Sequence, residues 1–75
     1  MIYELWETSS GNLVGTYTTE REALDIVQLG IERHGPHYAD TFLLGYEDLH
    51  GEAHVLAEGR ALADRACTHE RGESA

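Results

Sequence analysis

The feature that most constrains the fold is one capped helix in the middle of a chain of only 75 residues. The segment from Thr19 to Glu22 is a capping box, in which the Thr19 hydroxyl accepts from the Glu22 amide and the Glu22 carboxylate reaches back. Gly35 and Pro36 supply the stop, because glycine adopts left-handed backbone and proline cannot continue a helix. We therefore expect one long helix over residues 19–34, with 18 residues before it and 41 after it.

Each half has the pattern of two strands joined by turn residues. The expected strands cover residues 2–7, 13–18, 41–47 and 52–57. Gly59 is expected to end the last strand, before a short helix over 60–66. The halves share this order of elements without a residue-level repeat. The pattern predicts a small single α+β domain over 1–67 with the order ββαββα, and a flexible C-terminal tail over 68–75.

We expect a four-stranded antiparallel sheet with the long helix packed on one face and the short helix at the C-terminal end. The alternation of side chains places Tyr3 and Leu5 on one face, and Ile2 and Trp6 on the other. Since both faces carry large apolar side chains, the face away from the long helix needs a cover. The short helix with the loop over 36–40, a second copy of the chain, or a partner could supply it.

The size of the domain favours a cover from outside the chain. A core this small typically contributes only about 3–5 kcal/mol unless something reinforces it. An internal disulfide is excluded, because Cys67 is the only cysteine. A metal, self-association or close packing is left. We expect an interface, and the candidate partner-binding residues are Ile2, Trp6, Val14 and Leu29.

The charge balance restricts the kind of partner. There are 14 Asp and Glu against five Arg, no Lys, and a net charge of −9 with histidine neutral. Such a chain is repelled by nucleic-acid phosphates and by anionic membranes, so neither is an expected partner. A basic protein is a possible one. No apolar run is long enough to span a membrane and the N-terminus lacks a signal-peptide pattern, so we expect the cytoplasm.

The histidines and the cysteine are the residues most open to a chemical interpretation. His34 and His37 flank a Gly-Pro turn, and His50 and His54 flank a second turn, so neither pair matches a helical metal-binding face. Cys67 could be a nucleophile only beside a base in a formed site, and it lies at the expected start of the tail. We therefore predict no catalytic residue, metal site or cofactor. Uptake of protons by the five histidines near pH 5–7 is a milder hypothesis.

The first hairpin followed by Thr-Glu-Arg-Glu-Ala-Leu, from Thr19 to Leu24, resembles the strand-to-helix junction of HicB-type antitoxins. The resemblance covers six residues and assigns a role to none of them. It favours the hypothesis of an acidic regulator that masks a basic partner, whose main support is the charge of −9 without Lys.

The leading hypothesis is a small acidic, non-enzymatic protein-interaction module that self-associates as a homodimer through the uncovered sheet face or a sheet edge. The alternatives are the antitoxin-like regulator and a metal- or ligand-responsive domain lined by histidines between subunits. Strand order and hairpin register stay open.

Overall fold

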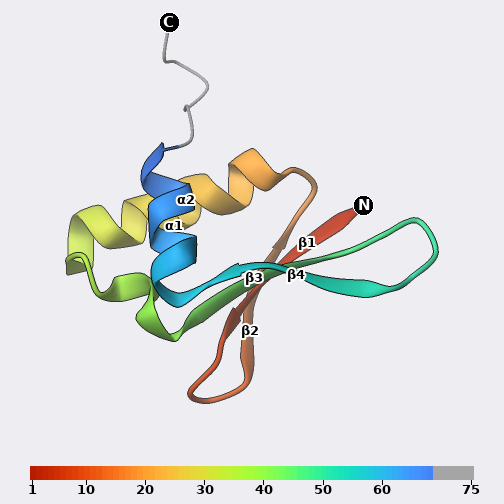
Figure 1. Ribbon diagram of the computed structural model, residues 1–75, viewed down its shortest axis with the longest axis horizontal. Helices are drawn as coiled ribbons and strands as arrows, with labels where there is room; N and C mark the ends of the chain where they lie inside the picture. Colours follow the sequence, from red (N-terminus) through yellow and green to blue (C-terminus); the bar gives the residue numbers. More distant parts are fainter. Residues whose placement is uncertain (69–75) are drawn as a thin grey trace, which may run out of the picture.

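The computed structural model describes residues 1–68 and has the predicted element order and fold class (Figure 1). The strands are β1 (Ile2–Glu7), β2 (Asn12–Tyr17), β3 (Phe42–Glu47) and β4 (Ala53–Glu58). The helices are α1 (Glu20–His34), the short 3-10 turn η1 (Tyr38–Thr41) and α2 (Gly59–Thr68). The sheet is antiparallel with strand order β2-β1-β3-β4, which the sequence left open.

The last helix differs from the prediction at both ends. Gly59, expected to end β4, is the first residue of α2 and takes a positive φ of 56°. Cys67 lies inside this helix and not at the start of a tail, because α2 continues to Thr68. The rest of the predicted tail, residues 69–75, is outside the described residues.

The capping box of α1 is present with a changed pattern of donors. The Glu22 amide donates to the Thr19 hydroxyl over 3.2 Å, as predicted. The Glu22 carboxylate accepts from the Thr18 hydroxyl at 2.7 Å and from the Thr19 hydroxyl at 3.2 Å. These hydrogen bonds, that from Thr18 first, lower the pKa of Glu22. At the other end the Gly35 amide donates to the Ile31 carbonyl, which closes the helix.

Both helices and η1 pack on the same face of the sheet (Figure 1). The core joins the two central strands to this helical layer. Its buried members are Leu5, Leu44, Ala23, Leu24, Val27, Ala39, Leu62 and Ala66. The alternative in which the short helix and the 36–40 loop cover the second face is therefore wrong: Leu62 and Ala66 anchor α2 beside α1, and Ala39 anchors η1 there.

The two hairpins have corresponding irregularities on either side of the contact of β1 with β3. Leu5 and Leu44 face each other across this contact. Directly after each of them the pairing with the outer strand is interrupted by one extra residue, Val14 in β2 and Leu56 in β4. Both edge strands thus carry a β-bulge at the corresponding position, a similarity that the side-chain sequence does not reveal.

Gly30 lies inside α1 at a position where alanine, normally the better helix residue, does not fit. Glycine inside a helix normally costs about 1 kcal/mol relative to alanine. A Cβ on Gly30 would overlap the Tyr38 ring, which stacks on His34 at 5.4 Å and contacts Phe42 at 4.7 Å between ring centroids. We therefore expect Gly30→Ala to destabilise the fold by about 1–3 kcal/mol in chemical denaturation. In a Tyr38→Ala background the same change should stabilise; a stabilising effect in the wild type would contradict the packing.

The β1–β2 turn depends on one carboxylate. Glu7 accepts from the Ser10 and Ser9 hydroxyls and from the Ser10 amide. These hydrogen bonds, that of the Ser10 hydroxyl first, lower the pKa of Glu7 from 4.5 to about 2.

Because the folded-state pKa is depressed, the Glu7 contribution to stability is complete above about pH 4.5 and is lost as the pH falls toward 2. We expect the unfolding free energy to decline over this window, and to decline less steeply in Glu7→Gln. Denaturation curves at stepped pH measure both slopes. Identical slopes for the two proteins would show that Glu7 does not contribute to the pH dependence of the unfolding free energy.

Candidate functional site

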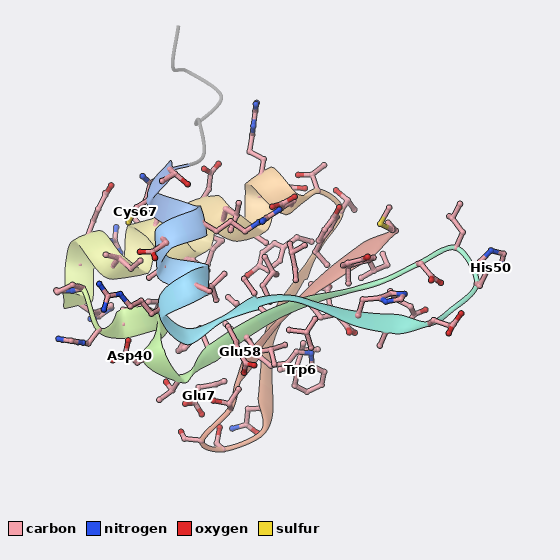
Figure 2. The ribbon with its side chains drawn as sticks, in the orientation of Figure 1. Trp6, Glu7, Asp40, His50, Glu58 and Cys67 are labelled. Carbon is pink, nitrogen blue, oxygen red and sulfur yellow. The ribbon has the colours of Figure 1, made fainter. Side chains whose placement is uncertain are left out.

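The face of the sheet away from the helices is the main candidate, and we call it the open face. Cross-strand partners lie on the same side of a sheet, so the register assigns its members. Figure 2 shows Trp6 and Glu58 on the side of the sheet away from the helices. The members are Ile2, Glu4, Trp6, Leu13, Thr16, Leu43, Gly45, Glu47, Ala53, Val55 and Glu58.

The apolar part of the open face crosses all four strands. Trp6 lies between Leu13 on β2 and Leu43 on β3, its register partners on either side. The exposed fractions are 45% for Leu13, 43% for Ile2 and 61% for Val55, whereas Trp6 and Leu43 are half-buried. Exposed apolar side chains that share a face with a half-buried tryptophan are typical of an interaction site.

Carboxylates are interspersed with these apolar side chains. By the register, Glu4 is paired with Gly45, Glu47 with Ile2, and Glu58 with Leu43. Within residues 1–68, no hydrogen bond or ion pair engages the side chains of Glu4, Glu47 or Glu58. The open face therefore presents unneutralised negative charge around an apolar centre.

The arginines of the described residues are all on the other layer. Arg21 and Arg33 belong to α1, and Arg60 and Arg65 belong to α2. Arg65 donates from Nε to the Glu20 carboxylate at 2.5 Å, a contact between the two helices. The two layers of the molecule consequently differ in charge character, with every arginine of the described chain on the helical layer.

The structure divides the four predicted partner-binding residues. Ile2 and Trp6 come together on the open face. Val14 is exposed on β2, but it is the bulge residue and has no register partner. Leu29 is exposed on α1, in the opposite layer, so it does not join the same surface. Sequence reasoning missed Leu13 and Val55, because their place on the open face depends on the strand register. Leu43 also lies on this face, and its alternation with the buried Leu44 was a signal that could have assigned it.

The sheet edges are weaker candidates than the face. Bulges interrupt β2 at Val14 and β4 at Leu56. A bulge twists an edge strand and breaks the regular row of backbone groups that a new strand would pair with. Of the two contact modes predicted from the sequence, burial of the open face is the better supported.

A cleft of about 590 Å³ lies on the helical layer, between the end of α1, η1 and α2. Its polar lining includes His37, whose Nδ1 is 3.0 Å from Asp40 Oδ2, together with Arg60, Asp64 and Cys67. Figure 2 labels Asp40 and Cys67, which also line this cleft. Cys67 is exposed, and the described residues provide no hydrogen-bonded base for its thiol.

Two of the four described histidines, His37 and His54, each contact a carboxylate. His54 Nε2 is 2.8 Å from Asp48 Oδ2, and Asp48 Oδ1 accepts from the His50 and Glu52 amides. The hydrogen bond from His54 is the first cause of the lowered pKa of Asp48. Residues 1–68 contain no group of three or more His, Cys, Asp or Glu arranged to hold a metal ion. His69 is outside the described residues.

No protein-family model, curated protein or solved structure matches this chain. Within the described residues, no helix is long and apolar enough to cross a membrane.

Proposed function

We propose that this chain is a non-enzymatic protein-interaction module whose open face is the contact surface. The observation that carries the proposal is the exposed apolar row around Trp6, on a sheet whose other face already holds both helices. Trp6 with its neighbours Leu13 and Leu43 has the composition of an interaction hot spot, a large aromatic side chain among aliphatic ones. The lone cysteine supports action in the reducing cytoplasm.

Two occupants fit an apolar face of this kind. One is a second copy of the chain, which would make the module a homodimer and extend its small core. The other is a different protein, whose basic groups would meet the acidic net charge of −9.

The native mass of the untagged protein, isolated from the cells that make it, tests the proposal. A mass of two chains supports self-association, and a mass that includes another protein supports a heterologous partner. A single-chain mass in fresh extract and at every concentration tested would contradict the proposed function.

A further inference from the structure

If the open face is the contact surface proposed above, the distribution of charge over the molecule indicates what kind of partner it binds. We propose that it binds a basic amphipathic segment of another protein. Apolar side chains of that segment cover Trp6 and Val55, and its Arg or Lys side chains reach Glu4, Glu47 and Glu58.

The three carboxylates are spaced across the face and not gathered at one corner. Glu4 is on a central strand, between Thr16 and Gly45 in the register. Glu47 and Glu58 lie at opposite ends of the β3–β4 pairing. Glu58 and Glu4 therefore border the apolar row around Trp6, whereas Glu47 lies beside Ile2 and Ala53 at the other end of the face. A covering segment without cations would remove water from these carboxylates without forming an ion pair with them. The desolvation of an unpaired charge makes such binding unfavourable.

A second copy of the chain fits this surface poorly. In a two-fold contact of open face with open face, the carboxylates of both copies enter one interface, and the face offers no arginine to either. Like charges brought together in an interface are strongly unfavourable. A contact of the open face with the arginine-bearing helices of the next copy would be head-to-tail and would lead to open-ended assembly.

Nucleic acid and anionic membranes are also poor occupants. Both present phosphate or carboxylate groups, and the net charge of −9 repels them before contact. A protein segment that combines apolar side chains with guanidinium or ammonium groups matches both properties of the open face.

Trp6, the only tryptophan, gives a direct test in the whole protein. The probe is a synthetic peptide of leucine and arginine, spaced as an amphipathic helix and free of aromatic residues. Titration should shift Trp6 emission to shorter wavelength, with an affinity that falls as salt rises. In Glu47→Gln/Glu58→Gln the dissociation constant should rise about tenfold.

The matched control is Glu32→Gln/Asp64→Asn, which removes the same charge from exposed positions on the helices. It should change the dissociation constant less than about threefold. Equal weakening by both variants would overturn the inference, because attraction would then follow net charge alone.

Other results separate this inference from the proposed function. If a leucine–glutamine peptide of the same spacing shifts Trp6 equally, or if Trp6 emission changes on dilution of the protein alone, the open face is an interface without the proposed basic occupant. If Trp6 responds to no peptide and no dilution, the inference fails, and native mass then decides the proposed function separately.

Discussion

Val55→Arg is expected to weaken the native assembly about a hundredfold, because it places a positive charge in the surface that the basic partner covers. Val55 is 61% exposed and pairs with Gly45 on the open face, so arginine there meets solvent in the isolated chain and should leave the fold intact. In the assembly the same guanidinium would replace an apolar contact and would repel a basic partner. Native mass over a dilution series measures the change.

Leu49→Arg is the matched control. Leu49 is 87% exposed in the turn between β3 and β4, outside the open face, and the substitution makes the same change in charge. The assembly should dissociate at nearly the wild-type concentration. If Leu49→Arg dissociates the assembly as strongly as Val55→Arg, or if neither does, the open face is not the contact surface.

Leu44→Ala should leave most of the protein unfolded. Leu44 is fully buried on a central strand, where it pairs with Leu5 beneath the helical layer. Such a truncation typically costs about 2–5 kcal/mol, because the cavity is only partly filled by relaxation. An isolated domain of this size has about 3–5 kcal/mol in total, so the loss consumes nearly all of it. Circular dichroism and thermal unfolding measure the outcome.

The comparison for this change is Leu49→Ala, made at an exposed turn position. Surface changes of this kind usually stay within about 0.5 kcal/mol of the wild type. A cooperative unfolding transition of Leu44→Ala close to that of Leu49→Ala would show that the core is not centred on the β1–β3 contact.

The elements of the fold could be predicted because their signals are local. The capping box at Thr19 and the stop at Gly35 act within a few residues of the helix ends, and both are present in the structure. The position of α2 could not be predicted in the same way. An apolar stripe containing Leu62 and Ala66 shows that the helix is amphipathic, but not which face of the sheet it covers.

The candidate site was only partly predictable because strict alternation fails at a bulge. By a period of two, Leu13 and Gly15 would share a face of β2. The extra residue Val14 places Leu13 beside Trp6 on the open face, and Gly15 beside Leu5 on the helical face. Ile2 and Trp6 were predictable because β1 pairs with β3 without interruption.

Hydroxyl-radical footprinting of Trp6, read by mass spectrometry, tests the central claim most directly. The native assembly and the separated chain are oxidised in parallel, and the peptide that contains Trp6 is compared with the one that contains Cys67, exposed on α2. We predict that oxidation of Trp6 falls several-fold in the assembly while that of Cys67 is unchanged. Equal oxidation of Trp6 in both states, with protection of Cys67 in the assembly, would place the contact on the helical layer and contradict the claim.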